Sequence, residues 1–125
     1  MSKEKIEIEY IINISPSILF NRLSSPSGLS EWFADDVNLN GKIFTFIWDG
    51  AEQEAEQVLR KENKMVRYHW LDDDPETYFE FKINVDELTG DTALVVVDFT
   101  DPDEKEDTIE LWNQQIDALK HLLGA

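Results

Sequence analysis

Apolar and polar residues alternate at the N-terminal end of the chain. Isoleucine or tyrosine occupies every second position from Ile6 to Ile14, and charged or amide residues fill most positions between them. A period of two over this length is typical of a strand with one buried face. The pattern therefore predicts a half-buried strand over residues 5–14.

Two Ser-Pro pairs follow this strand and predict two short helices in tandem. Ser15 and Ser25 are suitable N-caps, and Pro16 and Pro26 suit the first helical position. The apolar residues expected on the buried faces are Leu19, Phe20 and Leu23 for the first helix, and Leu29, Trp32 and Phe33 for the second.

The stretch from Asp35 to Thr100 reads as an antiparallel meander. Asn40-Gly41 and Asp49-Gly50 are strong signals for tight hairpin turns. Short apolar or alternating runs, separated by turn residues, predict six strands. We expect these strands near residues 37–39, 43–48, 51–60, 65–71, 76–85 and 93–99.

The C-terminal segment predicts one long amphipathic helix over residues 104–123. Asp101 is placed to cap it, Pro102 suits its first turn, and Gly124 suits its end. Its apolar stripe consists of Ile109, Trp112, Ile116, Leu119 and Leu123. An antiparallel sheet with one apolar face needs a cover, so we expect this helix across the concave face, with Trp112 and Ile116 buried. The element order predicts an α+β fold.

Five segments in this order resemble the START-like, or helix-grip (SRPBCC), superfamily, and more narrowly its branch related to activators of the heat-shock-protein ATPase. They are SPSILF at 15–20, PSGLSEWF at 26–33, NGKIFTF at 40–46, VRYHW at 66–70, and the stretch from LW to LK at 111–120. The resemblance implies a curved antiparallel sheet of about seven strands around the long C-terminal helix. It also implies a cavity that often holds an apolar ligand.

Composition restricts the function further. The 125 residues suit one domain, 1–125, and a 42% apolar content excludes intrinsic disorder. No apolar run approaches the ~18 residues of a membrane span, and the N-terminus does not resemble a secretory signal, so we expect a cytoplasmic protein without membrane insertion. The 27 acidic and 11 basic side chains give a net charge of −16, which disfavours nucleic acids. A protein partner would present a basic surface.

Aromatic residues are the candidate ligand-binding groups, because they share faces of the predicted strands. Small residues and amides on the 51–60 strand would leave space and orient a ligand, and Trp32 and Phe33 would form the lip of the opening. The alternative is an ordinary core that the same aromatic rings fill. The candidate residues are Trp32, Phe33, Phe44, Phe46, Trp48, Gln53, Ala55, Gln57, Tyr68, Trp70, Phe79, Phe81, Trp112 and Ile116.

The sequence gives little indication of a catalytic site or a metal-binding site. The chain has no cysteine, and His69 and His121 have no evident nucleophile to activate, so we expect structural roles for both histidines. The acidic stretch 72–76 lacks the spacing of a calcium loop, and Asp35 and Asp36 suit a polar rim. No cofactor or metal is expected. The leading function is non-catalytic binding of a small, mostly apolar ligand. The alternatives are a protein-interaction module resembling chaperone ATPase activators and, less favoured, a cyclase-like or hydrolase-like enzyme.

Overall fold

The computed structural model describes residues 3–125; Met1 and Ser2, part of the N-terminal segment considered for a signal, lie outside them. In chain order the elements are β1 (Glu4–Ile11), α1 (Pro16–Ser24), α2 (Pro26–Leu29), β2 (Asp36–Asn40), β3 (Ile43–Trp48), β4 (Ala51–Lys61), β5 (Met65–Trp70), β6 (Phe79–Val85), β7 (Thr92–Thr100), the 3-10 turn η1 (Pro102–Glu104) and α3 (Lys105–Leu123).

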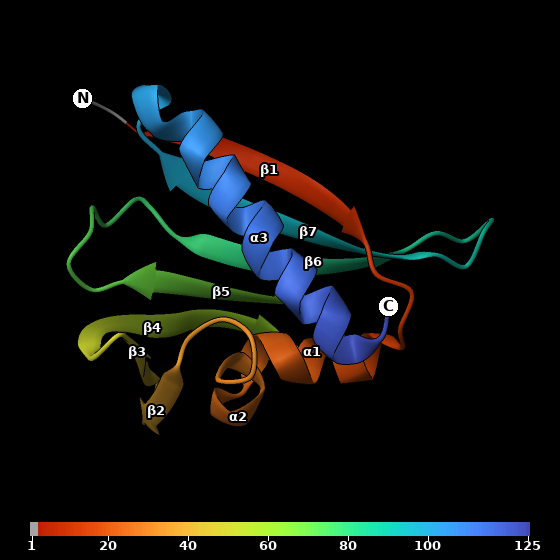
Figure 1. Cartoon of the computed structure of the whole chain (residues 1–125), viewed down its shortest axis with the longest axis horizontal. Helices are drawn as coiled ribbons and strands as arrows, with labels where there is room; N and C mark the ends of the chain where they lie inside the picture. The colour runs from red at the N-terminus through yellow and green to blue at the C-terminus, as the bar shows by residue number, and fades with distance from the viewer. Residues whose placement is uncertain (1–2) are drawn as a thin grey trace.

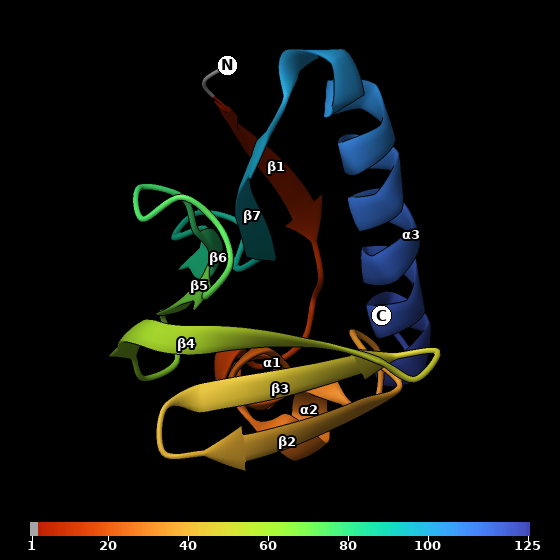
Figure 2. The same ribbon diagram turned by 90° about the vertical axis from the view of Figure 1, so that its left-hand side faces the viewer.

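The seven strands form one antiparallel sheet in the order β1-β7-β6-β5-β4-β3-β2. Figure 1 shows α3 lying across one face of this sheet, and Figure 2 shows the sheet curving around the helix, with β2–β4 turned steeply against β1 and β7. The predicted α+β helix-grip fold is confirmed. Among residues 3–125, no helix is both long and apolar enough to cross a membrane.

The first strand is shorter than its alternation predicted. β1 pairs with β7 from Glu4 opposite Thr100 to Ile11 opposite Ala93. The Ile12 N–H still donates to the Thr92 carbonyl at 2.9 Å, but the chain then turns away into α1. Ile12 is nevertheless fully buried, so the apolar face continues beyond the end of the strand.

Both serine caps form as predicted. The Ser15 hydroxyl accepts the Ile18 N–H at 3.3 Å, and the Ser25 hydroxyl accepts the Gly28 N–H at 3.0 Å. Leu19, Phe20 and Leu23 are buried on α1, which confirms that face.

The second helix is shorter than expected. α2 ends at Leu29, so Trp32 and Phe33 lie in the turn that follows it, and the prediction that both belong to a helical face is wrong. The Leu29 carbonyl accepts the Phe33 N–H at 2.8 Å, and the Trp32 indole N–H donates to the Arg22 carbonyl at 2.7 Å. These bonds wind the chain back against α1.

The long helix confirms its predicted buried stripe but not its predicted cap. Trp112 and Ile116 are buried against the sheet, and Gly124 ends the helix in the left-handed conformation, with φ 70°. Asp101 precedes η1 instead of the first turn of α3, and its side chain makes no capping hydrogen bond. A hydrogen bond of 2.8 Å between the Thr100 and Thr108 hydroxyls joins the sheet to the helix there.

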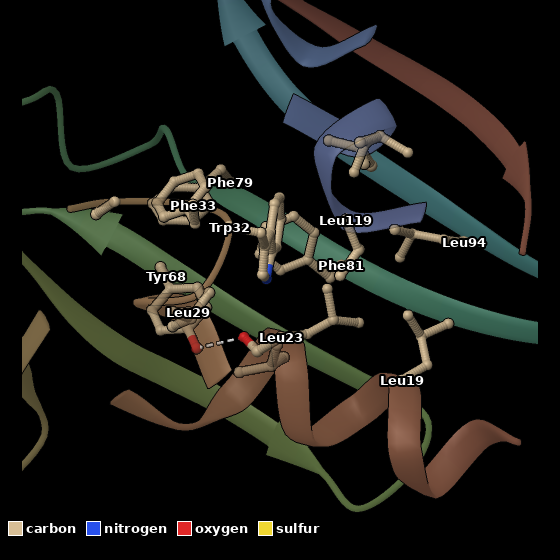
Figure 3. Packing of buried hydrophobic residues seen from close by; sticks show 14 of the residues in the cluster. Leu19, Leu23, Leu29, Trp32, Phe33, Tyr68, Phe79, Phe81, Leu94 and Leu119 are labelled. Atoms are coloured by element: carbon tan, nitrogen blue, oxygen red, sulfur yellow. Dashed lines mark hydrogen bonds between the residues drawn. The ribbon is translucent and has the colours of Figure 1, made fainter. Parts of the chain in front are cut away.

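The core lies between α1, the concave face of the sheet and α3 (Figure 3). Tyr68 on β5 is completely buried, its ring stacks on Phe79 at 5.0 Å, and its hydroxyl donates to the Leu23 carbonyl at 2.7 Å. Burial raises the pKa of this phenol far above its usual value, so the hydroxyl stays protonated as a donor. The bond ties the C-terminal turn of α1 to the middle of the sheet.

Replacing Tyr68 with phenylalanine should lower the free energy of unfolding by about 1–3 kcal/mol. The substitution keeps the ring but leaves the buried Leu23 carbonyl without this donor. Urea denaturation followed by circular dichroism measures the change. Tyr78→Phe removes the same atom from a half-buried ring on the opposite face and should cost clearly less. Equal costs for the two variants would contradict the prediction.

Candidate functional site

A groove of about 390 Å³ opens between the N-terminal half of α3 and the concave face of the sheet. This volume is within the range of small-molecule sites. The residues that line it are Phe33, Trp48, Gln53, Trp70, Phe79, Asp98, Thr108, Leu111, Trp112 and Gln115. Aromatic rings dominate this lining, and only one of the side chains is ionisable.

Mutual ring contacts hold the aromatic wall in place. Phe33 stacks on Trp112 at 5.9 Å and on Phe79 at 5.7 Å, and Trp70 packs on Phe79 at 5.0 Å. The Trp48 indole N–H donates to the Phe33 carbonyl at 2.8 Å, which joins β3 to the turn after α2. These contacts fix the positions of the rings relative to one another.

Asp98 on β7 is the one acidic group in the groove. Its Oδ2 accepts the Trp112 indole N–H at 2.9 Å, and its Oδ1 accepts the Phe99 backbone N–H at 2.7 Å. Burial raises the pKa of this carboxyl, and the two hydrogen bonds offset only part of that effect. Gln53 and Gln115 add neutral amides to the rim, and the Gln115 amide lies 3.5 Å from the Phe33 carbonyl.

Part of the predicted ligand-binding set lines this groove, and part does not. The members on the groove wall are Phe33, Trp48, Gln53, Trp70, Phe79 and Trp112. The members packed elsewhere in the interior are Trp32, Phe44, Phe46, Ala55, Gln57, Tyr68, Phe81 and Ile116. The two alternatives, a pocket and a filled core, thus describe two ends of the same interior.

In the part of the interior that side chains fill completely, three residues are placed differently from what we expected. Trp32 is buried against α1 and forms no lip. Ala55 is fully buried and does not border the groove. The Gln57 amide is already engaged, because it lies 3.3 Å from the Ser24 carbonyl and 3.4 Å from the Tyr68 hydroxyl. None of the three is placed to touch a molecule in the groove.

Four groove residues were not among the candidates: Asp98, Thr108, Leu111 and Gln115. Asp98 had a usable signal, since it interrupts an apolar run and shares strand parity with Leu94 and Val96, which face the core. Leu111 and Gln115 flank the predicted helix stripe, where the sequence does not reveal how closely the sheet approaches.

The other polar candidates lie outside the groove. His69 is on the convex face, with Nδ1 2.8 Å from the Thr77 carbonyl, and His121 is exposed at the end of α3. The Asp35 carboxylate accepts the Asp49 N–H at 2.8 Å and so braces the β3–β4 turn; neither it nor Asp36 forms the expected rim. Within residues 3–125, no group of three or more His, Cys, Asp or Glu is arranged to hold a metal ion.

A larger hollow of about 670 Å³ lies at the opposite end of the sheet, near Pro16 and the β4–β5 turn. Lysines and asparagines contribute much of its lining, and it contains no aromatic ring. A site for an apolar molecule needs apolar walls that exclude water. The aromatic groove meets this requirement better despite its smaller volume.

Comparisons with known proteins agree with this architecture. BfR322 from Bacteroides fragilis is 42% identical, with a TM-score of 0.71 over 98% of this chain and 93% of that chain. The Aha1 dimer from Colwellia psychrerythraea is 20% identical, with a TM-score of 0.78 over 94% of this chain and 93% of that chain. MLL2253 from Mesorhizobium loti is 21% identical, with a TM-score of 0.77 over 97% of both chains. The last two likenesses concern the fold alone.

No curated protein matches the chain. The model of the START-like superfamily domain, in contrast, matches residues 1–125, which is the whole sequence. Because this match agrees with the curved sheet, the helix across it and the two short helices after β1, the protein belongs to the START-like superfamily.

Proposed function

We propose that this protein binds a small, mostly apolar ligand, without catalysis, in the groove between α3 and the sheet. START-like folds commonly bind hydrophobic ligands or mediate interactions. The observation that carries the proposal is the groove itself: about 390 Å³, walled by Phe33, Trp48, Trp70, Phe79 and Trp112. A ligand there gains about 25 cal/mol for each Å² of apolar area removed from water, before the cost of its immobilisation.

The polar groups of the groove favour binding over catalysis. Within residues 3–125, Thr108 supplies the only hydroxyl of the lining, and that hydroxyl is hydrogen-bonded to Thr100 at 2.8 Å. Asp98 is the only ionisable residue of the lining, and Trp112 and the Phe99 backbone already donate to its carboxylate. Covalent hydrolysis usually requires a nucleophile beside a general base, and the lining contributed by the described part of the chain contains no such pair.

An environment-sensitive apolar dye should bind the native protein saturably, with one molecule per chain. Gln53→Trp, at an exposed position on the groove rim, should fill the space and weaken the dye at least about tenfold, which corresponds to ~1.4 kcal/mol. Fluorescence titration measures both affinities. Glu54→Trp adds the same ring on the opposite face of β4 and should leave the affinity unchanged. Equal affinities for the native protein and both variants would contradict the proposed site.

Binding of a protein partner with a basic surface is the second candidate function. It is favoured by Glu52 and Glu54, which are exposed on the convex side of β4, and by the net charge of −16. Such an association should weaken as salt screens it. Reversing both charges with Glu52→Lys and Glu54→Lys should abolish it and leave dye binding in the groove intact.

A further inference from the structure

We infer that the ligand of the groove is an amphipathic organic amine, whose apolar body packs against the aromatic wall and whose ammonium group pairs with the carboxylate of Asp98. The inference rests on the proposed function and specifies the chemical class of the ligand. The juxtaposition that carries it is one carboxylate among aromatic rings, in a groove with no other ionisable side chain.

The Asp98 carboxylate retains acceptor capacity. It accepts one hydrogen bond on each oxygen, from the Trp112 indole and from the Phe99 backbone. A carboxylate offers about four lone-pair sites, so about two remain available. Both donors are neutral, and within residues 3–125 no lysine, arginine or histidine nitrogen lies within 4.0 Å of this carboxylate. Lys3 lowers the pKa of Asp98 through its charge, but its ammonium group is itself paired with Asp73 at 3.0 Å.

A buried carboxylate without a cationic partner is costly, and a ligand cation offsets part of that cost. The raised pKa of Asp98 is in line with this, because its cause is the loss of water around the charged form. A cationic head would form a charge-assisted hydrogen bond, which is about twice as strong as a neutral one. A ligand carboxylate would instead meet a like charge at the same point.

The aromatic wall and the whole protein favour the same sign of charge. Trp48, Trp70 and Trp112 line the groove, and indole rings attract cations through the negative potential of their faces. The net charge of −16 raises the local concentration of cations and lowers that of anions. The aromatic rings also supply the apolar contact area, so an ammonium group without an apolar body would bind weakly.

Three probes with a common phenylbutyl body test the inference: phenylbutylamine, phenylbutanol and phenylbutyrate. Calorimetry gives their affinities for the native protein, and NMR locates each probe by the indole N–H resonances of Trp48, Trp70 and Trp112. The amine should bind about tenfold tighter than the alcohol, and the acid should bind weakest. Only the amine should strongly shift the side-chain carboxyl carbon of Asp98, a measurement that needs no variant.

Asp98→Asn removes the charge and keeps one acceptor for the Trp112 N–H. It should lower the amine affinity about tenfold and leave the alcohol affinity unchanged. Asp117→Asn is the matched control, because it removes the same charge from an exposed position on α3 that is outside the groove. It should preserve the preference for the amine.

The outcomes separate this inference from the proposed function. Equal affinities of amine and alcohol, with shifts at the groove tryptophans, would overturn the ammonium preference and retain an apolar site. A preference for the amine that Asp117→Asn abolishes as fully as Asp98→Asn would also overturn it, because the attraction would then come from net charge. If none of the probes shifts the groove resonances, both the inference and the proposed function fail.

Discussion

Replacing Trp112 with alanine should lower the free energy of unfolding by about 3–5 kcal/mol, the usual cost of truncating a buried aromatic residue. Trp112 is only 6% exposed, and it joins α3 to the sheet. Its ring stacks on Phe33 at 5.9 Å and meets the edge of Phe81 at 5.8 Å, and its N–H donates to Asp98. Alanine removes all three contacts and leaves a cavity under the helix. Urea denaturation followed by circular dichroism measures the loss.

Two further variants test whether the cost comes from the buried position of Trp112 and from its indole group. Leu111→Ala shortens the neighbouring side chain, which is 56% exposed, and should change stability by about 0.5 kcal/mol or less. Trp112→Phe keeps an aromatic ring but removes the donor to Asp98, so its cost should fall between the other two. A loss below about 1 kcal/mol for Trp112→Ala would contradict its central place in the core.

Replacing Arg67 with alanine should cost about 3 kcal/mol, because it strands a buried carboxylate on the convex face. The Glu80 side chain is only 4% exposed, and its Oε1 accepts the Arg67 Nε–H at 2.7 Å. Lys82 is the other cation near it, and its Nζ lies 3.9 Å from Oε2. The Arg67 guanidinium also covers the Tyr78 ring at 4.1 Å, so alanine removes a cation–π contact as well. Chemical denaturation at neutral pH measures the effect.

The exposed pair of Arg60 and Glu62 is the natural comparison. Its nitrogen–oxygen distance is 3.1 Å, but the two side chains are 43% and 68% exposed, so removing Glu62 should cost at most about 0.5 kcal/mol. A double-mutant cycle completes the test: Glu80→Gln should make Arg67→Ala much less costly, since the stranded charge is gone. Additive effects of the two substitutions would show that the pair does not interact.

Much of the candidate site was predictable from strand parity. Trp48, Trp70 and Phe79 occupy inward positions of predicted strands, and each lines the groove. Parity specifies which face a side chain occupies, but it does not specify what lies opposite. Phe46 and Phe81 share the same inward faces, yet the turn after α2 and the long helix cover them completely. Whether an inward aromatic ring lines a groove or fills a core therefore depends on long-range packing.

The bulge in β4 also could not be predicted from strand parity, although it lies within a single strand. Pairing with β5 shifts register between Gln57 and Leu59, which reverses the facing of the residues that follow. Arg60 consequently pairs with Val66 on the concave side, and its guanidinium lies 5.1 Å from the centre of the Phe20 ring. No turn residue or glycine marks this irregularity in the sequence.

Local sequence patterns were sufficient to predict the element order, both serine caps, the end of α3 at Gly124 and the apolar stripe of α3. Each of these features depends on residues within a few positions of one another. Contacts between distant segments determined the rest. The groove exists because Phe33, Asp98 and Trp112 meet from a turn, a strand and a helix. These residues are far apart in the chain, so no local periodicity could predict that they come together. The burial that raises the pKa of Asp98 likewise appears only when the helix closes over the sheet.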